Sequence, residues 1–335
     1  MTVLVGEEQM STERESIVLG VASRERACSD RSFAFPGRPA GLAVAPEGRL
    51  FASDATSRTI WRIDHGGGRT FAVAPAGGVP DATGTGKRVL SPAGLALGPD
   101  GTLFVADTAG HRVWAIAPTG DLRVVAGSVY GYRDGPGDEA LFRYPTDVAI
   151  GADGTCYVAD AGNHRIRTIS PAGVVATLAG SIYDYGDGRG PEGRFRQPLA
   201  LDIDAEGTCY VADTGNNAVR RVTPDGEVTT LAGSPPGGAD DGVGADVGLR
   251  WPTGIALGHD GELWVADQGN GALRRIDPDG ASTTTLRLAG RRWPVAVALA
   301  PDAEVLVAAE VLVAAEVLDD EHRPQTCLIS AGAGR

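Results

Sequence analysis

The chain has 335 residues, and its 48 glycines and 21 prolines are more turn-forming residues than a helical protein carries. Its 43 acidic and 30 basic residues give a formal net charge of −13, which disfavours broad binding to nucleic acid. No stretch of about 18 or more apolar residues is present and the start of the chain does not resemble a secretion signal, so we expect a cytoplasmic protein, monomeric by default, with no membrane partner.

The first predicted elements lie at the N-terminus. Residues 1–13 are short of apolar side chains and are expected to form a flexible tail, whereas residues 14–335 are expected to form one domain. Within that domain, residues 17–23 (IVLGVAS) are an apolar run with the length and composition of a β-strand.

A repeated unit then dominates the chain. Each copy opens with a proline, and the first five copies follow one another at intervals of 53 or 54 residues. The prolines are Pro39, Pro92, Pro145, Pro198, Pro252 and Pro294. An aspartate stands 15 residues after each of the first five, at Asp54, Asp107, Asp160, Asp213 and Asp267, and Ala309 takes its place in the sixth copy. Regular self-similarity of this kind indicates a repeat architecture of six copies, the last of them degraded.

Each copy contains short apolar runs separated by turn residues. In the second copy these runs are residues 94–97, 103–106, 113–116 and 122–126. Short runs joined by Asp-Gly turns predict antiparallel strands, and four-stranded units repeated around an axis form a β-propeller. We therefore predict an all-β fold, a six-bladed β-propeller of four-stranded antiparallel blades.

The first strand of each copy alternates between large and small side chains. Positions three and five after the proline are large, as in Leu95 and Leu97, whereas positions two and four are mostly glycine or alanine, as in Gly94 and Ala96. Alternate residues of a strand point to opposite faces of its sheet. The large face of one blade is therefore expected to pack on the small face of its neighbour.

The last copy lacks an outer strand. Residues 326–329 are a candidate third strand, and the N-terminal run 17–23 is expected to supply the missing outer strand, which would remove the free edges of the ring. A hexapeptide, EVLVAA, occurs twice in succession at residues 304–315, and this segment is compatible with a helix or with a strand lengthened by duplication.

Four segments, YVADAGNHRIR, YVADTGNNAVR, WVADQGNGALR and FVADTAGHRVW, together with the connectors between copies, resemble the NHL-repeat family. The resemblance extends over about residues 36–300 and implies a six-bladed propeller. It implies no single activity, because family members serve as binding modules, sensor domains and scaffolds, and related six-bladed folds include lyases, lactonases and strictosidine-synthase-like enzymes.

The Asp-x-Gly-Asn-His turn of the third copy, residues 160–164, combines residue types that catalytic and metal sites use. Its aspartate recurs in five copies but its histidine only twice, at His111 and His164, whereas a catalytic constellation would be unique. Turn chemistry accounts for every residue, because aspartate accepts backbone N–H groups while glycine and asparagine tolerate positive φ. We interpret these turns as structural. The arginines seven residues after the aspartates are candidate partners for nearby acidic groups: Arg167, Arg220 and Arg274.

The connectors between copies are the candidate binding surface, because long loops gathered on one face of a disc are where ligands usually bind. Their acidic and aromatic residues are the candidate binding residues: Tyr130, Tyr132, Asp134, Tyr183, Tyr185, Asp187, Asp241 and Trp251. The alternative is that the connectors are ordinary glycine-rich turns with aromatic side chains packed beneath them. The spacing of a dedicated Ca²⁺ loop is absent, so we predict no metal and no cofactor.

Two positions that are small in the other inner strands carry an aspartate, Asp147 in the third copy and Asp202 in the fourth. Both are expected near the central channel, where two carboxylates could share a proton or hold a cation. The alternative is that backbone N–H groups or water satisfy them, and we favour it because a divalent cation normally needs more ligands.

These observations lead to two hypotheses. The first is a ligand- or protein-binding module that uses its loop face and channel mouth. The alternative is a small-molecule hydrolase or lyase with Asp147 and Asp202 as candidate catalytic residues. A channel in which three or more acidic or amide groups converge would favour the enzyme.

Overall fold

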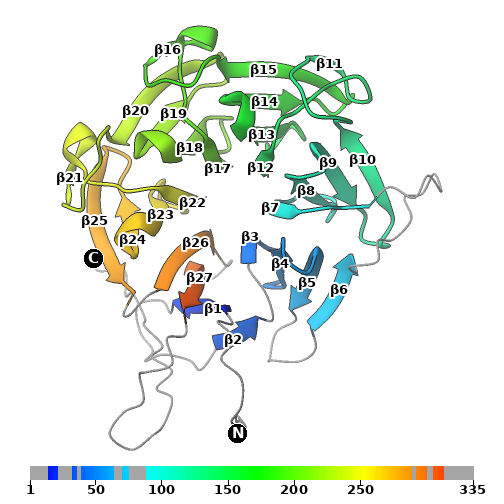
Figure 1. The fold of residues 1–335 in the computed structure, drawn as a ribbon, viewed down its shortest axis with the longest axis horizontal. Helices are drawn as coiled ribbons and strands as arrows, with labels where there is room; N and C mark the ends of the chain where they lie inside the picture. The colour runs from blue at the N-terminus through cyan, green and yellow to red at the C-terminus, as the bar shows by residue number, and fades with distance from the viewer. Residues whose placement is uncertain are drawn as a thin grey trace, which may run out of the picture.

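The computed structural model describes residues 14–21, 32–35, 39–63, 70–74, 88–288, 292–299 and 305–312. Its strands form antiparallel sheets arranged around a central axis, and one strand of each sheet lies nearest that axis (Figure 1). The predicted all-β propeller is confirmed at this level. The predicted tail, residues 1–13, lies outside the described residues.

Five sheets are blades formed by one continuous segment each, and the first two contain four strands. These are β3 (Pro39–Val44), β4 (Leu50–Asp54), β5 (Thr59–Ile63) and β6 (Thr70–Ala74), then β7 (Pro92–Leu97), β8 (Leu103–Asp107), β9 (Arg112–Ile116) and β10 (Leu122–Ala126). In each, the strand that opens with the proline is the inner one.

The next three blades contain five strands. The third has β11 (Gly135–Pro136), β12 (Pro145–Ile150), β13 (Cys156–Asp160), β14 (Arg165–Ile169) and β15 (Val174–Gly180). The fourth has β16 (Gly188–Arg189), β17 (Pro198–Ile203), β18 (Cys209–Asp213), β19 (Ala218–Val222) and β20 (Glu227–Gly233). The fifth has β21 (Gly242–Val243), β22 (Pro252–Leu257), β23 (Leu263–Asp267), β24 (Ala272–Ile276) and β25 (Ala281–Arg287).

The remaining sheet is a composite of the two ends of the chain. Its order is β2 (Ser32–Phe35), β1 (Arg14–Val21), β27 (Val305–Leu312) and β26 (Arg292–Leu299). The N-terminal run is therefore not the outer strand that we predicted, because β1 pairs with β27 on one side and with β2 on the other. Strand β27 begins in the first copy of the duplicated hexapeptide and continues into the second, so the strand interpretation is confirmed there. The predicted strand 326–329 lies outside the described residues.

The prediction of six blades with four strands each is wrong. Five blades arise from the repeats, three of them gain a fifth strand, and the last sheet is a composite. The extra strands β11, β16 and β21 are two residues long and come from connectors that fold against the outer strand of the following blade, at the rim of the ring (Figure 1). Glycine-rich segments this short carry no periodicity from which a strand could be predicted.

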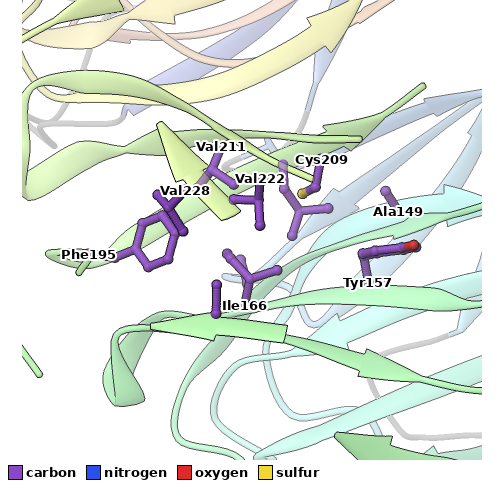
Figure 2. Close-up of a cluster of buried hydrophobic side chains, with 11 residues drawn as sticks. Ala149, Tyr157, Ile166, Phe195, Cys209, Val211, Val222 and Val228 are labelled. Atoms are coloured by element: carbon purple, nitrogen blue, oxygen red, sulfur yellow. The ribbon is translucent and has the colours of Figure 1, made fainter. Parts of the chain in front are cut away.

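The core consists of layers between neighbouring blades. In one layer Ala149 and Ile166 of the third blade pack with Leu201 and Val211 of the fourth, and Phe195 of the connector closes its outer end (Figure 2). The predicted packing of large on small inner-strand faces is thus confirmed. Burial of each large apolar side chain contributes about 1.5–3 kcal/mol to stability. Because these side chains lie in layers between neighbouring blades, their burial stabilises the packing of one blade on the next.

Buried arginines bind three of the connectors to their blades. Arg167 lies on β14 with no exposed surface, and its guanidinium contacts Asp160 at 2.7 Å and Asp134 of the connector at 2.5 Å. Arg220 and Arg274 repeat the arrangement with Asp213 and Asp187 and with Asp267 and Asp241. In the second blade Trp114 takes the place of arginine, and its indole N–H donates to Asp107 at 3.0 Å.

The aspartate turns are structural, as predicted. Asp160 accepts hydrogen bonds from the backbone N–H of Arg143 at 2.7 Å and from the amide of Asn163 at 2.8 Å. The next residues form the 3₁₀ helix η1 (Ala161–Asn163), which ends at His164 with φ of 58°. Equivalent helices are η3 (Thr214–Asn216) and η5 (Gln268–Asn270), while η2 (Gly190–Glu192) and η4 (Gly244–Asp246) lie in connectors.

Candidate functional site

The centre of the ring encloses a cavity of about 300 Å³. The inner strands β3, β7, β12, β17, β22 and β26 line it, mostly with backbone and with small or aliphatic side chains. The polar side chains among its lining residues are Thr146, Asp147, Asp202 and Thr253. Both predicted channel aspartates therefore lie where the sequence placed them.

Each channel carboxylate joins two blades. Asp147 accepts hydrogen bonds from the N–H of Val148 and, across the blade boundary, from the N–H of Leu201, both at 2.9 Å. Asp202 accepts in the same way from Ile203 and from Leu257 of the fifth blade, both at 2.8 Å. Each carboxylate is thus hydrogen-bonded by one backbone N–H of its own strand and one of the neighbouring inner strand, as expected for a structural role.

The absence of a side chain at Gly94 makes room for Asp147. A Cβ atom at Gly94, on the inner strand of the second blade, would lie 1.7 Å from Oδ1 of Asp147 and 2.5 Å from its Cα. The second and third blades therefore approach each other more closely than any other residue would allow.

Burial changes the acidity of both groups. Loss of solvation raises the pKa of Asp147 to about 8, the charge of Asp202 adds to this rise, and the two N–H donors oppose it. Loss of solvation likewise raises the pKa of Asp202 to about 6. With a pKa of about 8, Asp147 can hold a proton at neutral pH. Across the described residues, no three His, Cys, Asp or Glu side chains group as ligands for a metal ion.

Several predicted connector residues make contacts within the fold while their side chains stay about half exposed. Besides its arginine, Asp134 accepts hydrogen bonds from the backbone N–H and hydroxyl of Thr177. The hydroxyl of Tyr132 contacts that of Thr177 at 3.0 Å, and its ring lies 4.1 Å from the guanidinium carbon of Arg165. Tyr185 and Asp187 repeat these contacts with Thr230 and Arg220, and Asp241 does so with Thr284 and Arg274. These residues hold the connectors in place.

The other predicted aromatic residues are exposed on one face of the ring. We call the side of the ring on which the inner strands begin the connector face. It carries the turns 108–111, 161–164 and 214–217, and it also carries the connector ends 143–144, 196–197 and 250–251. The pairing of Pro145 with Asp160 places turn and connector end side by side. Trp251 is 58% exposed, Tyr183 51% and Tyr130 49%, values that place them among the most exposed large apolar side chains described.

A cluster of aromatic rings lies between the second and third blades. The ring of His111 lies 5.4 Å from that of Tyr130 and 4.8 Å from that of Tyr144, with edge-to-face geometry in both cases. Nδ1 of His111 accepts the backbone N–H of Tyr144 at 3.2 Å, which places the proton of the neutral ring on Nε2. Burial lowers the pKa of His111, so the ring is uncharged at neutral pH.

The pattern recurs at the next two boundaries between blades. His164 lies 5.0 Å from Tyr183 and accepts the N–H of Gln197, and burial lowers its pKa as well. At the third boundary the side chain of Asn217 accepts the N–H of Trp251 at 2.9 Å. Three related surface clusters therefore face the same side of the ring.

Sequence reasoning missed some of the residues that complete these clusters. They are Tyr144 and the arginines Arg143, Arg196 and Arg250, whereas His111 and His164 were considered only as parts of structural turns. The arginines stand two residues before the inner-strand proline in three successive copies, and this recurrence was a visible signal. The contact of His111 with Tyr144, separated by 33 residues, had no such signal.

Comparison with known proteins supports the repeat assignment. A family model described as NHL repeat matches residues 90–116 and 142–169, which contain the inner three strands of the second and third blades. A protein with the same repeat, NHL repeat-containing protein 2 of Bos taurus, is 26% identical over 283 residues. The chain belongs to the NHL-repeat family.

The NHL-repeat chain is also similar to much longer proteins. It is 28% identical over 280 residues to Protein SUPPRESSOR OF QUENCHING 1, chloroplastic, of Arabidopsis thaliana and 31% identical over 274 residues to Teneurin-m of Drosophila melanogaster. These alignments, with that of the bovine protein, cover 76%, 71% and 71% of this chain. The chain spans only 26%, 9% and 39% of the lengths of these relatives.

Solved structures resemble this NHL-repeat propeller in fold. A chain of a nidogen/laminin complex aligns with a TM-score of 0.59 and 16% identity, over 85% of this chain and 98% of that one. A streptogramin B lyase aligns with a TM-score of 0.56 and 14% identity, over 89% of this chain and 98% of that one. At these identities the likeness concerns the fold alone. Among the described residues, no helix has the length and apolar character needed to cross a bilayer.

Proposed function

We propose that this NHL-repeat chain is a protein-binding module and that its binding surface is the connector face. The observation that carries the proposal is the exposure of Tyr130, Tyr183 and Trp251 at three successive blade boundaries on one side of the ring. Exposed aromatic residues gathered on one surface are typical of protein interfaces, where Tyr and Trp contribute most of the binding energy.

The surface is built on a rigid base, which favours binding. The connectors that carry these aromatic residues are held by Arg167, Arg220 and Arg274, whose side chains have no exposed surface. A surface that is ordered before binding loses less conformational entropy on association. A propeller of similar fold occurs in a nidogen/laminin complex, which supports a role in protein association.

Selection of binding peptides from a random dodecapeptide phage library tests the proposal. We expect selected peptides to bind the protein, and Tyr183→Ser/Trp251→Ser to weaken their binding by at least about tenfold, because each lost anchor costs about 1 kcal/mol or more. The readout is fluorescence anisotropy with the labelled peptides.

A matched control removes apolar surface elsewhere. Val174 and Val243, 49% and 57% exposed, lie at the start of β15 and on β21, away from the turns of the connector face. Val174→Ser/Val243→Ser should bind the peptides as the wild type does. Peptides that bind both double variants equally well would contradict the proposal.

A second candidate function, hydrolysis or elimination on a small molecule, would use the central cavity. The raised pKa values of Asp147 and Asp202 favour it, since perturbed carboxyl groups in a cavity are typical of general acids and bases. Their complete hydrogen bonding to backbone N–H groups weighs against it.

Substitution separates this candidate from the first. If a panel of lactones and cyclic depsipeptides contains a substrate, Asp147→Asn and Asp202→Asn should each lower kcat at least about a hundredfold, as loss of a general acid or base does. Turnover that survives both substitutions would remove these residues from the catalytic candidates.

A further inference from the structure

Three arginines with exposed side chains occupy equivalent positions on the connector face: Arg143, Arg196 and Arg250. Their backbone groups are structural. The N–H of Arg143 donates to Asp160 at 2.7 Å, and its C=O accepts the N–H of Gly162 at 2.8 Å. Arg196 and Arg250 make the same two contacts in the fourth and fifth blades.

The fold does not require an arginine side chain at this position. In the second blade Leu90 donates its backbone N–H to Asp107 at 3.0 Å, which is the equivalent contact. A leucine therefore makes the same N–H contact with the turn aspartate, while the carbonyl group of Ser91 accepts the N–H of the turn residue Thr108. The three arginine side chains are available for contacts outside the fold.

The aromatic clusters hold two of these side chains in position. The guanidinium carbon of Arg143 lies 4.9 Å from the ring centre of Tyr130, and that of Arg196 lies 4.5 Å from the ring centre of Tyr183. Nε of Arg196 also donates to the hydroxyl of Tyr183. Stacking on an aromatic ring orients a guanidinium and leaves its edge free for a planar anion such as carboxylate.

The turn glycines make room for the aliphatic parts of the same arginines. A Cβ atom at Gly162 would lie 2.6 Å from Cγ of Arg143, and one at Gly215 would lie 2.5 Å from Cγ of Arg196. The glycines therefore allow each stem to lie directly over its turn. The guanidinium groups of Arg143 and Arg196 therefore lie next to the exposed rings of Tyr130 and Tyr183.

No carboxylate neutralises these charges within the part of the chain that the structure describes. None of the three guanidinium groups is in an ion pair there, and the connector carboxylates Asp134, Asp187 and Asp241 are bound to buried arginines. The chain as a whole carries a net charge of −13. Unpaired cations on one face of an acidic protein indicate a partner of opposite charge.

We propose that the connector face recognises an acidic, aromatic-containing segment of a partner protein. Arg143 and Arg196 would pair with its carboxylates, while Tyr130, Tyr183 and Trp251 would contact its apolar side chains. This inference rests on the proposed function and adds the chemical class of the partner. An acidic polypeptide fits better than a nucleic acid, because a polypeptide segment carries fewer negative charges per unit length than a phosphate backbone, so the net charge of the protein opposes its binding less, and its carboxylates pair with the guanidinium groups at short range.

Two synthetic copolymers of equal length test the inference: a random Glu–Tyr copolymer and an uncharged random Gln–Tyr copolymer, both fluorescently labelled. We expect the protein to bind the Glu–Tyr copolymer at least about tenfold more tightly at low ionic strength, with affinity that falls as salt increases. Arg143→Gln/Arg196→Gln should lose about tenfold of that affinity, and thermal unfolding confirms that the variant is folded.

The matched control removes the same charge from other strands. Arg123 on β10 and Arg221 on β19 are exposed, and Arg123→Gln/Arg221→Gln should bind as the wild type does. An equal loss in both double variants would show a non-specific charge effect and overturn the inference. Tighter, Arg143-dependent binding of single-stranded poly(U) RNA would overturn it in favour of a nucleic acid.

The dodecapeptides selected in the first experiment distinguish failure of the inferred acidic partner from failure of the proposed protein-binding function. If their binding requires Tyr183 and Trp251 but is unchanged in Arg143→Gln/Arg196→Gln, and the Glu–Tyr copolymer is not preferred, the inference fails while the proposed function stands. If neither peptides nor copolymers depend on any of these residues, both fail.

Discussion

Replacing Arg220 with methionine should lower the free energy of unfolding by about 3–5 kcal/mol, measured by urea denaturation at neutral pH. The guanidinium contacts Asp213 at 2.9 Å, and neither side chain has any exposed surface. Methionine would leave a buried carboxylate without its cation. It would also remove the donors for the carbonyl groups of Arg194 and Gly186.

A neighbouring residue provides the control for this experiment. Arg221 follows on the same strand with an exposed side chain, so Arg221→Met should change stability by less than about 0.5 kcal/mol. Adding Asp213→Asn to Arg220→Met should recover part of the loss, because the uncompensated charge disappears. Similar stability of Arg220→Met and Arg221→Met would show that the buried ion pair does not hold the connector to its blade.

The stability of the protein should fall as pH rises from about 4 to about 8, and Asp147 should account for a large part of the slope. Its pKa is raised from 3.8 to about 8 in the folded state. Between these values the folded state binds more protons at this carboxyl than the unfolded state does. The free energy of unfolding therefore decreases with pH, by up to about 1.4 kcal/mol per pH unit.

Asp147→Asn tests this assignment because it removes the titrating group. The free energy of unfolding of the variant, measured by urea denaturation between pH 5 and pH 8, should depend less on pH than that of the wild type, so the two curves converge or cross as pH rises. Asp138→Asn, at an exposed position of a connector, should run parallel to the wild type. A parallel curve for Asp147→Asn would show that the channel carboxylate is charged throughout.

Both predictions concern charged or titratable groups that are shielded from solvent: the Arg220–Asp213 ion pair and the carboxyl group of Asp147. The aspartate–arginine pairs recur in three blades and stabilise the connectors, whereas Asp147 and Asp202 each occur once and replace small residues. The connector face combines the two patterns: its base is repetitive, and its exposed residues change from blade to blade (Tyr144, Gln197, Trp251). A repeated frame with variable surface residues suits recognition of an irregular partner surface.

Much of the fold was predictable because its determinants are local or periodic. The proline and aspartate spacing, the large and small alternation and the turn chemistry of residues 160–164 all follow from patterns within one copy. The positions of Asp147 and Asp202 in the channel followed from register alone. The contacts that Asp134 and Tyr132 make within the fold did not, since they involve Thr177 and Arg167 on two other strands.

The sequence by itself therefore determined the repeat, the all-β propeller and the structural nature of the aspartate turns, because strand periodicity and turn preferences act over a few residues. Only the tertiary structure decided how the chain ends combine in one sheet, which connector residues bind the buried arginines, and that Arg143 lies against Tyr130 beside His111. These outcomes depend on packing between segments distant in the chain, where burial and shape, not local preference, set which side chains meet.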